Sequence, residues 1–312
     1  MKMLQLYEPP EAAAIAGSQN EERNLKLLFA QRRLYSRSKT WTIVRGVGVG
    51  VIAVAAPLIA AFWEPLAVWA AAIAAGWYIL SRVVFRRLER RYATRGASAQ
   101  ELFDTSVFGM PTIAVREPRL LPEDVARVVG RGYPRQRQAF ADEKLQNWYP
   151  IRTNVPGRVA IAIAQRGNLA YARRLLQRQA TLWLWLLCGW AVTAIVIALC
   201  FEFSLVTFLL AVALPIMPPL VDAWEEYSQI RAAGLEREAL ANEIEDAIRA
   251  DTASPITSQQ LLAWQGQLFA LRRDSPLVPD WLYWRLRDRA EAEMSEAAET
   301  IEGTLARQKE GT

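Results

Sequence analysis

The sequence predicts an all-α integral membrane protein, in which two transmembrane helical hairpins carry a mainly helical cytosolic module formed by the central segment and the C-terminal helices. Four long apolar runs support this prediction, at Trp41 to Trp63, Pro65 to Phe85, Leu182 to Phe201 and Phe203 to Trp224. At about 1.5 Å of rise per helical residue, each run covers roughly the 30 Å hydrocarbon thickness of a bilayer. A buried helix of a soluble protein is the alternative for a single run, but buried apolar stretches are usually shorter.

The short connections between the runs define the two hairpins. Glu64 lies between the first two runs and Glu202 between the last two, so both hairpins should turn on the same face of the membrane. Lys and Arg cluster at the opposite ends of the runs, and in short flanking segments these residues resist translocation. We therefore expect the N terminus, the central segment and the C-terminal tail to lie in the cytoplasm. The first residues lack the pattern of a cleavable signal, so we expect them to be retained.

The composition and the position of the runs divide the chain into five segments. The 312 residues are 52% hydrophobic and 22% charged, and the charged residues lie mostly outside the runs. We expect an N-terminal segment with an amphipathic helix (1–40), a first hairpin (41–86), a central cytosolic region (87–181), a second hairpin (182–222) and C-terminal cytosolic helices (223–312).

The segments flanking the first hairpin should be helical. Residues 20–39 place Leu25, Leu28 and Phe29 at helical spacing, with basic residues at other positions. This pattern favours a helix that lies on the membrane surface or packs on the cytosolic module, and that continues into the first run. Residues 86–105 should continue the helix of the second run, weakened at Gly96.

Prolines divide the central region into a loop and several helices. Pro111, Pro118 and Pro122 predict a loop that ends in a helix beginning near Pro122. A glycine-rich break follows, and residues 135–150 are predicted to be helical up to a stop before Pro150. From Pro156 the chain has few breakers, so one helix should run without interruption into the third run.

The C-terminal region should also consist of helices. The fourth run continues into a segment of alternating charges, which indicates an exposed or coiled-coil-like helix. Residues 254–257 form a helix start. Trp281, Tyr283 and Trp284 stand beside several arginines and could stack on a base. The alternative, an interfacial anchor or a helix-packing patch, is the interpretation favoured for this cluster.

The residue types that are missing restrict the chemistry. The chain has no His, and its two cysteines, Cys188 and Cys200, both lie in the third run. His-dependent catalytic triads, His-ligated zinc and CxxC chemistry are therefore excluded. No P-loop or GxGxxG motif is present, so we expect neither an enzyme nor a metal site. The net charge of +5 is explained by topology and anionic lipid, so polymeric nucleic acid is not expected as a partner.

Several sequence blocks resemble those of a known family. The blocks are RRLYSRSKTW (Arg32 to Trp41), ELFDTSVFGMP (Glu101 to Pro111), the Tyr149-Pro150 pair and AQRGNLAYARRLL (Ala164 to Leu176). Together with the two hairpins, they resemble the four-transmembrane effector family of bacterial CBASS anti-phage systems. The effectors of this family accompany CD-NTase nucleotidyltransferases. The resemblance covers residues 34–248. The chain departs from the family pattern at Thr112, where the family tends to have Trp, and at Tyr171-Ala172, where it tends to have Trp-Asp.

The resemblance implies a membrane effector with no catalytic step. Such a protein lies in the bacterial inner membrane and is inert until a cyclic di- or trinucleotide made by the CD-NTase binds its cytosolic part. It then oligomerises or rearranges, permeabilises the membrane and causes abortive infection. The cyclic oligonucleotide is the activating ligand, and no cofactor is implied. The alternative is a ligand-independent membrane scaffold that recruits a protein partner through its cytosolic helices.

A cyclic oligonucleotide requires guanidinium or amino groups for its phosphates, and aromatic or guanidinium planes for its bases. The residues that offer such groups or lie beside them are Arg166, Asn168, Tyr171, Arg173, Arg174, Trp148, Tyr149, Asp104 and Thr105. Arg166 and Asn168 form the preferred pair, because topology alone demands neither. Arg173 and Arg174 could instead contact lipid headgroups, and Asp104 could cap a helix or pair with an Arg of the preceding segment.

Two charges near the membrane boundary are candidates for a pore or gate. Arg45 and Arg82 lie inside or at the edges of the apolar runs. Snorkelling of these long side chains to the cytoplasmic interface is the alternative explanation. Because four spans enclose little room for an aqueous path, a conducting assembly would need several copies, and we expect a homo-oligomer.

Overall fold

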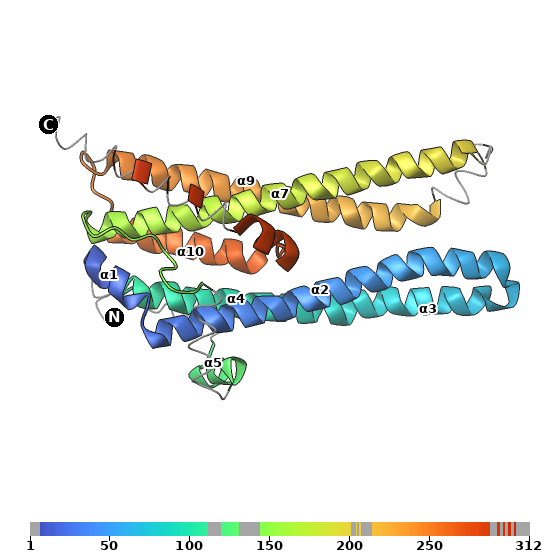
Figure 1. Cartoon of the computed structure of the whole chain (residues 1–312), viewed down its shortest axis with the longest axis horizontal. Coiled ribbons are helices and arrows are strands. Elements are labelled where there is room, and N and C mark those ends of the chain that lie inside the picture. Colours follow the sequence, from blue (N-terminus) through green and yellow to red (C-terminus); the bar gives the residue numbers. More distant parts are fainter. Residues whose placement is uncertain are drawn as a thin grey trace, which may run out of the picture. The chain divides into compact units, whose positions relative to one another are not determined.

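The computed structural model describes residues 7–111, 120–130, 144–200, 204, 206, 214–287, 292–293, 296, 299–300 and 303. Within these residues all regular structure is helical, as predicted (Figure 1). The chain divides into two compact units, unit 1 (Met1–Gly157) and unit 2 (Arg158–Thr312). Each unit contains one of the predicted hairpins together with part of the predicted cytosolic module.

Unit 1 consists of two long antiparallel helical segments with short helices around one end. Its elements are α1 (Ala12–Ser18), α2 (Glu22–Phe62), the 3-10 turn η1 (Glu64–Leu66), α3 (Ala67–Leu80), the π-helical turn η2 (Ser81–Phe85), α4 (Arg86–Val107) and α5 (Pro122–Val129). The chain reverses direction near η1, and α2 then lies alongside α3 and α4 (Figure 1).

The helices of unit 1 cross the predicted membrane boundary without a break. The helix predicted over residues 20–39 and the first apolar run form the single helix α2, which confirms the predicted continuation. Likewise α3, η2 and α4 follow one another directly. Gly96 does not interrupt α4, and the Tyr35 ring of α2 lies against it where a side chain is missing. A Cβ at Gly96 would lie 2.8 Å from Cδ1 of Tyr35.

The segment before Pro150 is not helical where the structure describes it. The predicted helix of residues 135–150 lies outside the described residues up to 143, and residues 144–150 form turns. Lys144 and Asn147 have positive φ angles of 51° and 50°. The backbone of this segment pairs with side chains from the N-terminal region instead of with itself. The N–H of Tyr149 donates to Oε1 of Gln19 at 2.9 Å, and the Gln19 amide donates to the Tyr149 carbonyl at 3.2 Å.

Unit 2 has two long helices, followed by shorter ones, in the residues that the structure describes. They are α7 (Gly157–Cys200), which begins at the last residue of unit 1, α9 (Leu214–Ala250), α10 (Ser258–Asp274) and a helix at residues 280–287. The uninterrupted helix predicted from Pro156 into the third run is confirmed by α7. The predicted start near residues 254–257 is also confirmed, because Thr257 and Gln260 form a capping box at α10. The turn at Glu202 lies outside the described residues.

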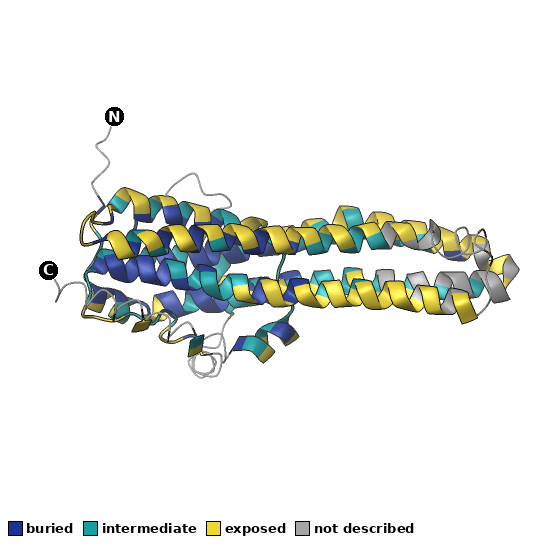
Figure 2. Cartoon of the chain, turned by 90° about the horizontal axis from the view of Figure 1, so that it is seen from above, coloured by how far each residue is buried: buried dark blue, intermediate teal, exposed yellow. Residues whose placement is uncertain are grey.

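Buried and exposed residues are distributed in opposite halves of the long helices. Figure 2 shows the buried residues near the shorter helices, and exposed residues along the rest of each long pair. The core of unit 2 contains Leu176 and Ile230, which lie outside the apolar runs. The exposed large side chains include Trp69 at 69% and Trp185 at 72% exposure, both inside the runs. The most apolar parts of this sequence are therefore its most exposed parts, the reverse of a water-soluble protein.

The structure identifies fewer membrane spans among the described residues than the four predicted. Among the described residues, one continuous helix, Val68–Val107, is both long enough and apolar enough to cross a bilayer. It contains α4 and the second predicted run from Val68 onward. The structure thus supports the all-helical class and one span, and the four predicted spans remain a prediction.

Candidate functional site

The predicted ligand-binding residues are distributed over both units. Arg166, Asn168, Tyr171, Arg173 and Arg174 lie on α7 in unit 2, whereas Asp104, Thr105, Trp148 and Tyr149 lie in unit 1. The residues of each unit are described in turn.

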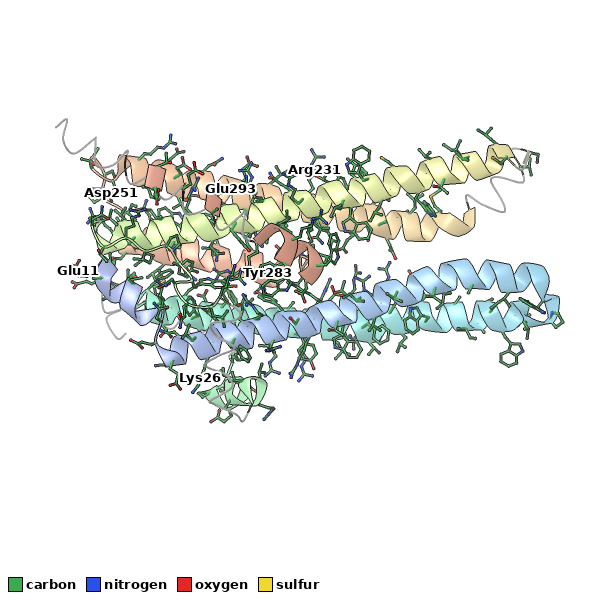
Figure 3. The ribbon with its side chains drawn as sticks, viewed as in Figure 1. Glu11, Lys26, Arg231, Asp251, Tyr283 and Glu293 are labelled. Carbon is green, nitrogen blue, oxygen red and sulfur yellow. The ribbon has the colours of Figure 1, made fainter. Side chains whose placement is uncertain are left out.

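The arginines of α7 pair with acidic residues of α9. Nε and Nη2 of Arg166 donate to Oε2 of Glu245 at 3.1 and 2.8 Å. Nη2 of Arg173 donates to Oε1 of Glu238 at 2.6 Å. Nearer the start of α7, Arg158 donates to both carboxylate oxygens of Asp251 at 3.0 Å. We call these three pairs the α7–α9 ladder. Figure 3 shows Asp251 just beyond the end of α9.

The ladder follows from the spacing of the charges along two antiparallel helices. Arg166 and Arg173 are seven residues apart, and so are Glu238 and Glu245. Seven residues make about two helical turns, so both arginines lie on one face of α7 and both acids lie on one face of α9. The acids were not predicted as part of a site. Their matching seven-residue spacing is the sequence signal that could have identified them.

The ladder is accessible to solvent. Arg166 and Glu245 have side chains that are 19% and 18% exposed, and the Arg173 pair is more exposed. Ion pairs that water reaches contribute little to stability. A guanidinium group in such a pair presents donors in a planar fork that fits a phosphate as well as a carboxylate. An anionic ligand could therefore replace the α9 carboxylates at these arginines.

The structure does not bring Asn168 together with Arg166. A helix turns by about 100° per residue, so side chains two residues apart point in directions that differ by about 200°. Arg166 and Asn168 therefore lie on nearly opposite faces of α7. Asn168 is half-buried and makes no side-chain hydrogen bond to any residue that the structure describes. The preferred pair of the sequence analysis is thus separated, and Arg173 is the residue that shares the face of Arg166.

Tyr171 and Arg174 contact the C-terminal part of unit 2. The Tyr171 ring meets that of Tyr283 edge to face, with a centroid distance of 6.4 Å, and Arg174 forms an ion pair with Glu293. Arg287, which is buried, lies over the Trp284 ring at 5.3 Å. Tyr283 thus packs on α7, whereas Trp281 and Trp284 are 60% and 49% exposed, and the choice between an interfacial anchor and a helix-packing patch stays a prediction.

In unit 1, Asp104 and Tyr149 meet in the core. Both are buried, and the Tyr149 hydroxyl donates to Oδ1 of Asp104 at 2.7 Å. The Tyr149 ring packs against Phe103 and Phe108, with centroid distances of 6.1 and 5.4 Å. The exposed fraction of Tyr149 is only 3%, so its ring offers no free stacking surface in this conformation. The sequence analysis considered a helix cap or an arginine as the partner of Asp104. The structure adds a different partner, a tyrosine 45 residues away in sequence.

The neighbours of this pair have more ordinary surroundings. The Thr105 hydroxyl donates to the Glu101 carbonyl one turn earlier in α4, at 2.8 Å. Trp148 is half-buried. Phe103, Val107 and Phe108, which have apolar spacing in the sequence, are buried as expected. This cluster is therefore a packed contact between α4 and residues 144–150.

The two gate candidates have partners in the first hairpin or just after it. Nε of Arg45 lies 3.5 Å from Oε2 of Glu89, and the Arg82 guanidinium lies 5.4 Å from the centroid of the Tyr78 ring. Trp41 stacks on Phe85 close by, at 5.5 Å. Aromatic rings and long cations at one level are typical of the membrane interface. These contacts favour snorkelling for Arg45 and Arg82.

Comparison with known proteins gives two matches. The family described as "SMODS-associating 4TM effector domain" matches residues 13–301. A protein of Bacillus cereus (strain VD146), described as "Probable CBASS effector molecule", is 25% identical over 285 residues, which are 88% of this chain and 94% of the relative. No solved structure matches the chain.

Proposed function

This chain belongs to the family of SMODS-associating 4TM effectors, and from this premise we propose that it is an anti-phage effector gated by a cyclic oligonucleotide. The cytosolic halves of the helices bind a cyclic di- or trinucleotide made by a CD-NTase. The apolar halves lie in the inner membrane and permeabilise it when several copies assemble or rearrange. The proposal includes no catalytic step and no cofactor.

The observation that carries the proposal is the continuity of the long helices. In α2 and α7 a half with a buried core passes without a break into a half whose large apolar side chains are exposed. Exposed apolar surface of this extent is stable in lipid and costs free energy in water. A change in packing at the cytosolic half is therefore transmitted along the same helix into the bilayer.

The α7–α9 ladder is the proposed phosphate site. Arg166 and Arg173 lie on one face, two turns apart, and each is paired with a solvent-accessible carboxylate. A phosphodiester that takes the place of Glu238 or Glu245 forms charge-assisted hydrogen bonds to the same guanidinium groups. The released carboxylates then repel the ligand's charge, which favours separation of α9 from α7. This exchange links binding to a rearrangement of the two helices.

Leakage of dye from proteoliposomes tests the function as a whole. The full chain is reconstituted at several densities and exposed to a panel of cyclic di- and trinucleotides, with linear nucleotides as controls. We expect one cyclic nucleotide to accelerate leakage, and the acceleration to increase with protein density. Leakage that is equal with and without every cyclic nucleotide would contradict the proposal and favour a scaffold or a constitutive pore.

Substitutions in the ladder test the site. Arg166→Gln and Arg173→Gln should each weaken nucleotide binding about tenfold, the loss expected for a charge-assisted hydrogen bond. Glu238→Gln should strengthen it, because the carboxylate that competes with the ligand is removed. Arg273→Gln is the matched control, since Arg273 pairs only with its neighbour Asp274 among the described acids. If Glu238→Gln weakens binding as much as Arg173→Gln, the ladder is a structural contact only.

A further inference from the structure

The α7–α9 ladder stops at a pocket. Two turns beyond the Arg173–Glu238 pair, the same faces of the two helices carry Ala180 on α7 and Arg231 on α9. At this level α9 supplies a cation, and α7 supplies no acid to pair with it. A pocket of about 230 Å³ opens at this point in unit 2, and both residues line it.

Small residues create the space. Ala180 faces α9, and Gly234 on α9 leaves a gap in which an added Cβ would still be 3.9 Å from Cβ of Leu176. Larger residues at either position would fill the pocket, as side chains do elsewhere along a packed helix pair. The cavity is therefore a consequence of two small residues, Ala180 on α7 and Gly234 on α9.

The pocket lies where the apolar part of α7 begins. Leu184, which lines it, is 42% exposed, and the side chains that follow along α7 are exposed and apolar. Tyr227 lines the opposite wall and packs against Trp224, with a centroid distance of 5.3 Å. Tyr and Trp at the start of an apolar segment are typical of the headgroup level of a bilayer. The open side of the pocket is thus placed at the depth of lipid phosphates.

The charge of the pocket is unbalanced. Arg231 is exposed and forms no ion pair with any residue that the structure describes. The other residues that line the pocket are neutral. Among them Gln177 has a side-chain amide that can donate hydrogen bonds to an anion, whereas the Thr181 hydroxyl donates to the Gln177 carbonyl at 2.9 Å. Leu184 and Leu235 supply an aliphatic wall beside these polar groups. The combination fits a molecule that has an anionic head and a hydrocarbon tail.

We propose that this pocket binds one anionic phospholipid, with its phosphate on Arg231 and Gln177 and an acyl chain along Leu184. The phosphate supplies the negative charge that α7 lacks at this rung of the ladder. The lipid thereby joins α7 to α9 at the membrane boundary, just where the ion pairs end. This site rests on the membrane insertion of the second hairpin, and it is independent of nucleotide recognition.

Native mass spectrometry of the detergent-purified full chain tests the site without nucleotide. The chain is mixed with phosphatidylglycerol or, separately, with phosphatidylcholine. We expect retention of phosphatidylglycerol to fall about tenfold in Arg231→Gln and to persist in Arg231→Lys. Arg178→Gln, the matched control, removes an exposed α7 cation that does not line the pocket, and retention should change less than about twofold.

A second variant tests the cavity itself. Ala180→Leu fills the space while keeping Arg231, and should also abolish selective retention. Circular dichroism and gel filtration show whether the chain has kept its fold.

Equal losses in Arg178→Gln and Arg231→Gln would overturn the site in favour of a general surface charge. Equal retention of both lipids, or displacement of phosphatidylglycerol by millimolar inorganic phosphate, would overturn the assignment to a phospholipid. Because nucleotide is absent, failure here leaves the gating proposal to its own test.

Discussion

At the scale of single residues, the cytosolic half of unit 1 depends on a few buried polar side chains. Asp104, Tyr149 and Gln19 connect α4, residues 144–150 and the segment after α1 by hydrogen bonds that are buried. Buried polar groups are costly when they lose a partner. Apolar spacing in the sequence was enough to predict that Phe103 and Phe108 are core residues. It could not predict the burial of Tyr149, because this depends on a contact with Gln19 that is 130 residues away in sequence.

Tyr149→Phe should destabilise unit 1. The change keeps the ring and removes the hydrogen bond to Asp104, at an expected cost of about 1–3 kcal/mol. Thermal unfolding of the detergent-solubilised chain, followed by near-UV circular dichroism, should show a melting temperature lower by about 2–10 °C. Tyr78→Phe is the control, because the Tyr78 side chain is half exposed in the first hairpin. Equal melting temperatures for both variants would show that the buried hydrogen bond is not a stabilising contact.

Tyr7 should make stability fall at alkaline pH. Its hydroxyl donates to the Phe108 carbonyl at 2.8 Å, and burial raises the pKa of Tyr7 above the ordinary value of about 10. Above pH 10 the unfolded chain releases a proton that the folded chain retains, so stability declines as the pH rises. Below pH 10 this term is constant. Melting temperatures measured between pH 8 and 11 should fall less steeply in Tyr7→Phe, and parallel curves would contradict this assignment.

At the scale of elements, the sequence predicted the long helices well and their pairing poorly. The absence of helix breakers from Pro156 onward predicted α7, and the apolar runs predicted the hairpin formed by α2 and α3. The partners of Arg166 and Arg173 were missed, because the seven-residue spacing of the two acids indicates a pairing only when it is matched to that of the arginines on another helix, and each helix taken alone does not show this. Likewise the helix predicted for residues 135–150 failed where Gln19 binds the backbone instead.

Gly96→Ala tests the packing of α2 on α4. The added Cβ would lie 2.8 Å from Cδ1 of Tyr35, so the two helices must separate or the ring must move, at a cost of about 1–3 kcal/mol. The double variant Gly96→Ala/Tyr35→Leu should recover most of this loss. Gly17→Ala is the control, since no heavy atom lies within 4 Å of its added Cβ. If the double variant loses as much stability as the two single variants together, the two residues do not contact each other.

At the scale of the whole molecule, the chain has the surface of a membrane protein. Each unit has a buried core at its polar end and exposed apolar side chains along its hairpin (Figure 2). This distribution accounts for four apolar runs in the sequence better than a soluble bundle does, because a soluble bundle buries its most apolar segments. The proposed topology places both hairpin turns outside the cytoplasm.

Cysteine labelling tests this topology. In a background with Cys188 and Cys200 replaced by Ser, a single cysteine is introduced as Glu64→Cys in the first turn or as Ser254→Cys after α9. An impermeant maleimide added to intact spheroplasts should label the first variant, and should label the second only after lysis. The opposite pattern, or labelling of both variants in intact cells, would show that the hairpins have another orientation.

The central claim is that the exposed apolar halves of the long helices lie in lipid, and fractionation of the expressed full chain tests it most directly. We expect the chain to remain in the membrane pellet after an alkaline carbonate wash and to be released only by detergent. A chain recovered as a monodisperse species in water without detergent would contradict the claim, because those apolar surfaces would then have to be covered by protein.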